Sequence, residues 1–220
     1  MTSVANDKLP IVILISGRGS NMLAIAEGAA SGALPVEIRA VISDKAEAAG
    51  LAAAAEMGIP TRALSPRGFA DRASYDVELA KLVAGFAPKL VVLAGFMRIL
   101  SAAFIATFAD RILNIHPSLL PLYRGLHTHR RCLEAGDALH GASVHFVTEE
   151  LDGGPLVIQA QVNVLPGDSE STLSARVQRQ EHRIYREAIE WFARGRLELR
   201  ERRAWLDGHP LDQPVIATSD

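Results

Sequence analysis

The sequence predicts an α/β fold with a mostly parallel central sheet, helices on both faces, and a C-terminal β-hairpin followed by a long helix. Short apolar runs alternate with segments of helical periodicity as far as residue 116, which is the order of a parallel β–α repeat. The first run, 9–16, is apolar on both faces, as are strands covered by helices on each side. After residue 140, two alternating segments and one long amphipathic segment replace the repeat.

The β–α repeat accounts for the first half of the chain. Strands are predicted at 9–16, 36–43, 59–64, 90–94 and 111–116. Helices are predicted from Met22 after a Gly-rich turn, over 45–58, over 69–87, and from Leu100 through Phe108. Gly58 and Pro88 supply the stop signals for the second and third of these helices.

Two polar residues interrupt the last strand of the repeat. Asn114 and His116 are two positions apart and therefore share one face of that strand. Pro117 ends the strand, which places both side chains at its carboxyl end, where parallel sheets bind ligands. A long irregular connection follows as far as Thr128, and a short helix is predicted from there to Ala135. Long loops in compact proteins are usually functional, so this edge of the sheet is the expected site.

The second half of the chain has a different pattern. Strands at 141–148 and 156–164, joined by a Gly-rich turn, predict a β-hairpin. A long amphipathic helix is expected over 169–194, and 197–205 is expected to add an edge strand. Because no repeat, linker or low-complexity segment interrupts the chain, we expect one domain over 1–220.

Composition narrows the class of protein. The 220 residues are 49% hydrophobic and 22% charged, with a net charge of −2 that offers no basic footprint for nucleic acid. No apolar run approaches the roughly 18 residues of a spanning helix, so we expect no membrane association and a cytoplasmic location. The only cysteine, Cys132, excludes an internal disulfide, and a packed side chain is a better interpretation of it than a nucleophile.

The Gly-rich turn Gly17–Asn21 stands between the first strand and the first helix. Backbone N–H groups and a positive helix terminus at such a turn suit a phosphate, and Ser20 and Asn21 are expected to cap the helix. The dinucleotide fingerprint would require a third glycine where Met22 stands, although Asp44 follows the second strand near the usual position of a ribose-binding acid. A monophosphate site is favoured, and a plain tight turn is the alternative.

Asp152, in the turn of the hairpin, completes an amide, imidazole and carboxylate set with Asn114 and His116. No serine or cysteine nucleophile accompanies the set in a recognisable elbow. An amide donor and a protonated imidazole suit the stabilisation of an oxyanion while the substrate supplies its own nucleophile. A carboxylate near an imidazole favours its charged form and can assist proton transfer. A single strand histidine is more often a satisfied core residue, but the prolines and Asn114 favour function here.

The remaining histidines carry weaker signals. His127 and His129 have the spacing of metal ligands on a strand, but no carboxylate or cysteine completes such a site, so no metal is expected. His145 is interpreted as a core residue or as a supporting group of the site. Three polar residues share one face of the long helix: Gln178, Glu181 and His182. This face either reaches a ligand or is simply solvated.

Four segments in this order and spacing resemble the phosphoribosylglycinamide formyltransferase family: Ile15–Asn21, Leu93–Leu100, Asn114–Pro121 and Gly141–Pro155. The similarity extends over nearly the whole chain and includes 180–182 and 204–208. It implies a single-domain, Rossmann-like formyltransferase fold. The N-terminal half would bind the mononucleotide, and the C-terminal half would contribute the folate-binding loop, the hairpin and the long helix.

The resemblance also implies a reaction, in which 10-formyltetrahydrofolate donates a formyl group to the amine of N1-(5-phospho-D-ribosyl)glycinamide during purine biosynthesis. The family's catalytic residues match Asn114, His116 and Asp152. The ribonucleotide-binding residues would be Gly19, Ser20, Asn21, Met22, Leu23, Gln178 and Glu181. The folate-binding residues would be Arg72, Met97, Arg98, Ile99, Leu100, Asn114, Thr148, Glu149, Glu150, Leu151 and Asp152. The partners would be these two small substrates, without metal, and the protein would be a monomer or homodimer.

Two residues depart from the common family pattern. Arg18 lies inside the glycine loop, where we expect it to face solvent, and Arg124 precedes Gly125 where a proline is frequent. We assign no functional role to Arg131 or to the tail after residue 208.

Related activities remain as alternatives. Formyltransferases that act on aminoacyl-tRNA or on a sugar nucleotide share the residues around His116 and Asp152, but a tRNA enzyme is expected to carry a further basic C-terminal domain. A formyltetrahydrofolate hydrolase is expected to carry an additional N-terminal domain. A nicotinamide nucleotide-binding protein would share the first strand and helix but would not explain Asn114, His116 and Asp152 together.

Overall fold

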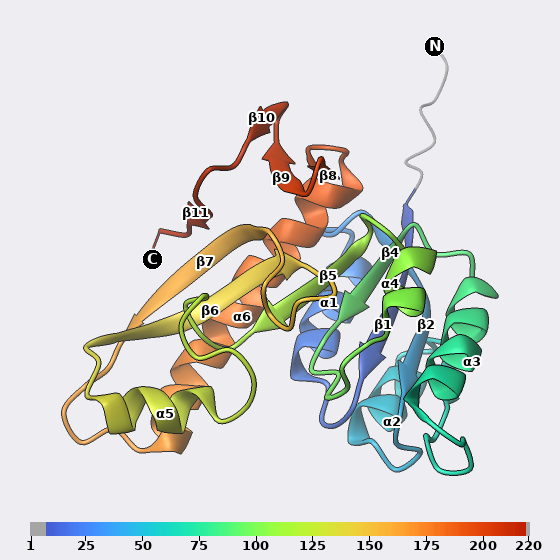
Figure 1. Ribbon diagram of the computed structural model, residues 1–220, viewed down its shortest axis with the longest axis horizontal. Coiled ribbons are helices and arrows are strands. Elements are labelled where there is room, and N and C mark those ends of the chain that lie inside the picture. Colours follow the sequence, from blue (N-terminus) through green and yellow to red (C-terminus); the bar gives the residue numbers. More distant parts are fainter. Residues whose placement is uncertain (1–7, 219–220) are drawn as a thin grey trace.

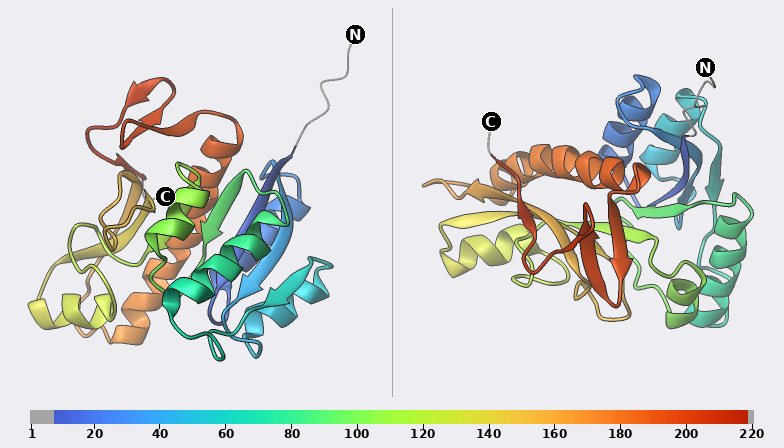
Figure 2. Two further views of the ribbon diagram at one scale, coloured as in Figure 1. Left: turned by 45° about the vertical axis from the view of Figure 1, so that its right-hand side comes forward. Right: turned by 90° about the horizontal axis from the view of Figure 1, so that it is seen from above.

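The computed structural model describes residues 8–218 and has a mixed eight-stranded sheet between two layers of helices (Figures 1 and 2). The sheet strands are β1 (Leu9–Ile15), β2 (Val36–Ser43), β3 (Thr61–Ala63), β4 (Leu90–Leu93), β5 (Ile112–His116), β6 (Leu139–Phe146), β7 (Leu156–Asn163) and β11 (Val215–Ile216). The helices are α1 (Ser20–Ala30), α2 (Ala49–Glu56), α3 (Arg72–Ala84), α4 (Ala102–Thr107), α5 (Thr128–Ala135) and α6 (Glu170–Ala193). A separate small sheet contains β8 (Leu197–Arg200), β9 (Arg203–Leu206) and β10 (His209–Pro210).

The strand order is β11-β7-β6-β5-β4-β1-β2-β3; the pairing changes from parallel to antiparallel at β5 and returns to parallel between β7 and the short strand β11. From β3 to β5 all neighbouring strands are parallel, whereas β6 is antiparallel to β5 and β7 is antiparallel to β6. The predicted hairpin and the predicted mostly parallel sheet are therefore confirmed. β5 belongs to both parts of the sheet, and it carries Asn114 and His116.

The central strand β1 shows why helices must cover both faces. Its odd-numbered residues, such as Ile13, belong to a core with α1, α2 and α6, whereas its even-numbered residues, such as Val12, belong to a second core with α3 and α4. Both side chains are fully buried, as expected for a strand that is apolar on each face. The left panel of Figure 2 shows α3 and α4 on the face of the sheet opposite α1 and α6.

Two sequence-based expectations about local structure are wrong. The segment 197–205 is not one edge strand, because Glu201 and Arg202 form a two-residue turn between β8 and β9 with φ of 49° and 61°. Ser20 and Asn21 do not cap α1, because Gly19 occupies the N-cap position with φ 74° and both residues lie inside the helix. The helix predicted from Lys45 begins only at Ala49.

None of the helices within residues 8–218 combines the length and the apolar character that a membrane crossing would require.

Candidate active site

The predicted polar pair lies on one face of β5. Leu113 and Ile115 pack into the core on the α6 side, so Asn114 and His116 point to the other face. Asn114 is paired with Leu93 of β4 in parallel and with His145 of β6 in the antiparallel direction. The two side chains therefore lie where the parallel and antiparallel parts of the sheet meet.

His145 orients the amide of Asn114. The Nε2 atom of His145 lies 3.0 Å from Nδ2 of Asn114, and its Nδ1 atom lies 2.9 Å from the carbonyl oxygen of Phe146. Burial lowers the pKa of His145 to about 4, so its ring is neutral near pH 7. Since a carbonyl only accepts, Nδ1 carries the proton and Nε2 accepts from Asn114. The second N–H of the Asn114 amide is left for another acceptor.

His116 is held by the long connection that follows β5. Its Nε2 atom lies 3.0 Å from the carbonyl oxygen of Tyr123, which requires Nε2 to carry a proton. The Nδ1 atom faces the Oδ2 atom of Asp152 at 3.6 Å. Both side chains are nearly buried, with 8% and 10% exposed, so solvent screens the interaction between them only weakly.

Asp152 lies on a loop whose backbone is left-handed at this residue, with φ of 49°. Its carboxylate lies close to His116 of β5 and His145 of β6. Oδ2 accepts a hydrogen bond of 2.8 Å from the amide of Gly125, and Oδ1 lies 3.9 Å from Nε2 of His145. The structure thus brings Asn114, His116 and Asp152 together and adds His145 to them.

A cavity of about 100 Å³ opens next to Asn114 and Asp152. Many of the expected folate-binding residues line it: Arg98, Ile99, Leu100, Thr148, Glu149, Glu150, Leu151 and Asp152. Arg72 and Met97 are not among its lining residues; Arg72 is exposed in the first turn of α3, and the Met97 side chain is 64% exposed. Drug-sized ligands usually occupy roughly 300–1,000 Å³, so a larger ligand must extend along the open surface beyond the cavity.

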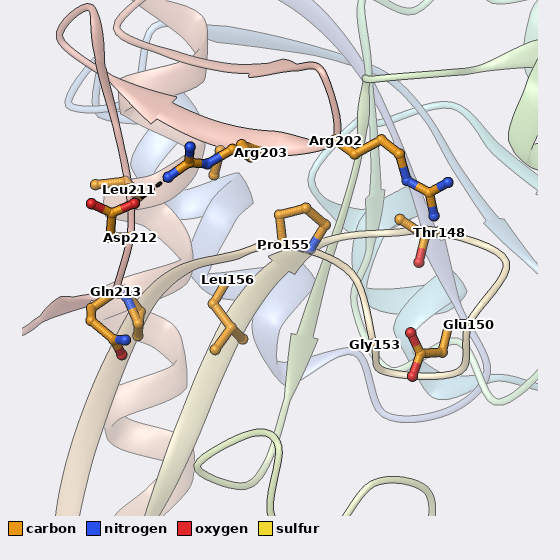
Figure 3. A pocket seen from close by; sticks show the side chains of 12 residues that line it. Thr148, Glu150, Gly153, Pro155, Leu156, Arg202, Arg203, Leu211, Asp212 and Gln213 are labelled. Carbon is orange, nitrogen blue, oxygen red and sulfur yellow. Dashed lines mark hydrogen bonds and ion pairs between the residues drawn. The ribbon is translucent and has the colours of Figure 1, made fainter.

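A second cavity, of about 430 Å³, lies against the loop between β6 and β7, which also borders the first cavity (Figure 3). It shares Thr148 and Glu150 with the first cavity, but its remaining lining residues come from the start of β7 and from the C-terminal segment. Arg203 is paired with Asp212 on its wall, and Glu150 is paired with Arg124. Because Asn114 and Asp152 line only the smaller cavity, and His116 contacts Asp152, we assign the chemistry to the smaller cavity.

The glycine loop is connected to the long helix α6. The Oγ atom of Ser20 accepts a hydrogen bond of 2.9 Å from Gln178, and Nδ2 of Asn21 donates one of 2.7 Å to the Oε2 atom of Glu181. Burial raises the pKa of Glu181, and the Asn21 hydrogen bond opposes that rise. The predicted face of α6 therefore points toward the glycine loop.

Other residues of the glycine loop region have different surroundings. Met22 is fully buried, so only its backbone is open to a ligand, and Leu23 is partly buried. Arg18 is exposed, as expected. Asp44 is buried 3.9 Å from Arg98, whose guanidinium lies over the ring of Tyr75. Asp44 thus faces Arg98, one of the expected folate-binding residues, rather than open space.

The remaining histidines do not form a metal site. His127 is exposed at the N-cap of α5, whereas Nδ1 of His129 lies 3.0 Å from Nε2 of His140. Among the described residues, no group of three or more His, Cys, Asp or Glu side chains is arranged to hold a metal ion. Cys132 is buried and unpaired, in agreement with a packed role.

Sequence reasoning missed two backbone groups of the site. These are the carbonyl of Tyr123 and the amide of Gly125, which contact His116 and Asp152. Their only signal in the sequence was the length of the loop that contains them.

Comparison with known proteins agrees with this geometry. A family model described as "Formyl transferase" matches residues 9–189. The phosphoribosylglycinamide formyltransferase of Escherichia coli (strain K12) is 56% identical, and the match covers 96% of this chain and 99% of that protein. The solved phosphoribosylglycinamide formyltransferase of Coxiella burnetii has a TM-score of 0.89 at 48% identity and covers 94% of this chain and 99% of its own.

A formyltetrahydrofolate deformylase from Pseudomonas syringae pv. tomato also has the fold, with a TM-score of 0.83 at 26% identity. The match covers 90% of this chain but only 66% of the deformylase chain. Both its identity and its coverage are lower than those of the formyltransferases from E. coli and C. burnetii. The chain therefore belongs to the phosphoribosylglycinamide formyltransferase family.

Proposed function

We propose that the protein transfers the formyl group of 10-formyltetrahydrofolate to the amine of N1-(5-phospho-D-ribosyl)glycinamide, as a step of purine biosynthesis. The observation that carries the proposal is that the Asn114 amide and the Asp152 carboxylate line one cavity, with the His116 imidazole 3.6 Å from that carboxylate. The products are the N-formyl ribonucleotide and tetrahydrofolate. Both substrates are small molecules, and the protein acts as a monomer or homodimer.

The reaction is direct attack of the neutral amine on the formyl carbon. A bond forms between the amine nitrogen and that carbon, and its carbonyl oxygen becomes an oxyanion. The N–H of Asn114 that is not engaged by His145 donates to this oxyanion, and imidazolium His116 adds positive charge beside it. The bond from carbon to the folate nitrogen then breaks, and the departing nitrogen takes up the proton that the amine releases.

Asp152 is suited to the proton transfer. Its carboxylate faces His116 at 3.6 Å, and it can carry the proton from the amine to the folate nitrogen directly or through water. The enzyme forms no covalent intermediate. Ser143 is paired with His116 across the sheet, but it is fully buried and its hydroxyl donates to the Ser118 carbonyl oxygen.

The ribonucleotide would lie between the glycine loop and α6. The backbone amides of 20–22 at the N-terminus of α1 suit its phosphate, whereas the amide of Leu23 already donates to the Gly19 carbonyl oxygen. Gln178 and Glu181 approach from the long helix. Glu181 is suited to the glycinamide end, because its carboxylate is buried and contacts Asn21 at the start of α1. The folate would occupy the cavity between Arg98–Leu100 and Thr148–Asp152, with Arg72 and Met97 contacting the part that extends beyond it. A cytosolic location completes the proposal and agrees with the unpaired, buried Cys132.

The test is a formyl-transfer assay with both substrates, followed by the absorbance of tetrahydrofolate. Turnover that requires the ribonucleotide supports the proposal, whereas folate release without any amine would indicate a hydrolase. Absence of turnover by pure, folded protein would refute the proposal. If His116→Ala or Asp152→Asn transferred the formyl group at the wild-type rate, the assignment of the catalytic residues would be refuted, but the proposed reaction would not.

A further inference from the structure

One short segment of the loop after β5 holds two catalytic groups at once. The carbonyl oxygen of Tyr123 accepts from Nε2 of His116 at 3.0 Å, and the amide of Gly125 donates to Oδ2 of Asp152 at 2.8 Å. Any shift of the segment 123–126 therefore moves the partners of both side chains together.

This segment has an unfavourable backbone conformation. Tyr123 has φ 57° and Gly125 has φ 78°, and the left-handed region is uncommon for a residue such as tyrosine. Such a conformation persists only where the surroundings impose it. The contacts that impose it are consequently part of how the site is positioned.

Arg131, in the first turns of α5, makes three of these contacts. Its Nη1 atom lies 2.7 Å from the carbonyl oxygen of Arg124 and 3.4 Å from that of Leu126. Its guanidinium carbon lies 5.3 Å from the centre of the Tyr123 ring, within the range of a cation–π contact. One side chain thus contacts three of the four residues in the segment.

Asp137 anchors the same segment from the other end. The hydroxyl of Tyr123 donates to the Oδ2 atom of Asp137, which raises the pKa of Tyr123 to about 12 and keeps its proton in place at neutral pH. Arg131 and Asp137 therefore hold the backbone and the ring of Tyr123 from two directions.

We propose that Arg131 is a positioning residue: by bracing the segment 123–126, it orients His116 through the Tyr123 carbonyl and Asp152 through the Gly125 amide. The inference rests on the proposed formyl transfer. It gives Arg131 a role that neither its exposure nor its place on a surface helix indicates.

The test compares Arg131→Ala with Arg130→Ala. Arg130 is a matched control, because it is the adjacent exposed arginine and its ion pair is with Glu134 on the same helix. Arg131→Ala is expected to lower kcat about 10- to 100-fold, since a small misplacement of catalytic groups is costly. KM for both substrates should stay within about twofold and Tm should not change, because Arg131 is exposed. The kcat of Arg131→Lys should lie between those of Arg131→Ala and the wild type, because lysine can donate to one carbonyl but does not cover the Tyr123 ring.

A second arm distinguishes positioning from a structural role. In an Asp152→Asn background, Arg131→Ala should lower kcat less than threefold, because the effects of residues that act through one another are not additive. An unchanged loss in that background, or equal kcat values for Arg131→Ala and Arg130→Ala, would overturn the inference. Loss of kcat together with a lower Tm and no rescue by Arg131→Lys would also overturn it. A wild-type enzyme without formyl transfer would instead refute the proposed function.

Discussion

Asn114 and His145 face each other across β5 and β6, with Nδ2 of Asn114 3.0 Å from Nε2 of His145. The Phe146 carbonyl fixes the proton of His145 on Nδ1, so the neutral ring can only accept from Asn114. The direction of the Asn114 amide, the proposed oxyanion donor, is therefore set by a histidine on the neighbouring strand.

Replacing His145 with phenylalanine should misdirect that donor. His145→Phe keeps a ring in the buried position but removes the acceptor, so kcat should fall about 10- to 100-fold. KM for both substrates should stay within about threefold, because the oxyanion exists only after attack. His145→Gln, which retains an acceptor, should recover part of the rate. Steady-state kinetics of both variants measure this, and equal kcat values for His145→Phe and the wild type would contradict it.

Glu181→Gln should separate stability from function. Burial raises the pKa of Glu181, so the folded state binds its proton more tightly than the unfolded state and loses stability as pH rises from about 4.5 through the raised value. Glutamine has no charge to bury and can still accept from Asn21. Tm at pH 8 should be equal to or about 2–4 °C above that of the wild type, while KM for the ribonucleotide should rise about tenfold. Thermal melts at pH 6 and 8 together with KM values test both halves, and a lower Tm at pH 8 would count against the burial argument.

Stability should fall in mild acid because of two buried histidines. Burial lowers the pKa of His140 and of His145 to about 4, so between about pH 6.5 and 4 the unfolded state binds more protons. The stability that these two neutral histidines contribute to the folded state is complete above about pH 6.5 and is lost as pH falls toward 4. Glu181 acts in the opposite direction, so the free energy of unfolding should decrease by about 2 kcal/mol or less from pH 7.5 to 5.5. Urea unfolding at both pH values measures it, and His140→Gln should reduce the difference.

Gly50→Ala should disturb the glycine loop. The amide of Gly50 donates to the carbonyl oxygen of Gly17 at 3.0 Å, and an added Cβ would lie 2.6 Å from Cδ1 of Ile15 and 3.1 Å from that same oxygen. KM for the ribonucleotide should rise about fivefold or more, because overpacking costs about 1–3 kcal/mol and displaces the loop. Gly85→Ala is the control, since its Cβ would approach nothing closer than 3.4 Å. Equal KM values for the two variants would argue against a role of this packing in binding.

The strand that carries the site could be predicted because its signals are local. Alternation and Pro117 define β5, and they place Asn114 and His116 on one face without knowledge of any other segment. The pairing of Asn114 with His145 could not be predicted, because it depends on the register of two strands that are distant in sequence. The role of Tyr123 also escaped prediction, since left-handed backbone at a tyrosine has no sequence signal.

The two wrong expectations have the same physical origin. Glu201 and Arg202 form a turn that usually requires asparagine or glycine, so nothing in the sequence marked the end of β8. Ser20 is a residue type that favours N-caps, but Gly19 takes the position because the loop needs a left-handed residue there. In both cases the surrounding structure overrides a local preference.

The change of pairing direction at β5 has a consequence for cooperativity. In the proposed arrangement, the ribonucleotide contacts the loop before α1 and the helix α6, and the folate contacts the loop after β6, so the two substrates together would restrain both parts of the sheet. Opening either part would then require a substrate to leave. Amide hydrogen exchange in β1 and in β7, which lie on opposite sides of β5, should therefore slow together when substrate binds.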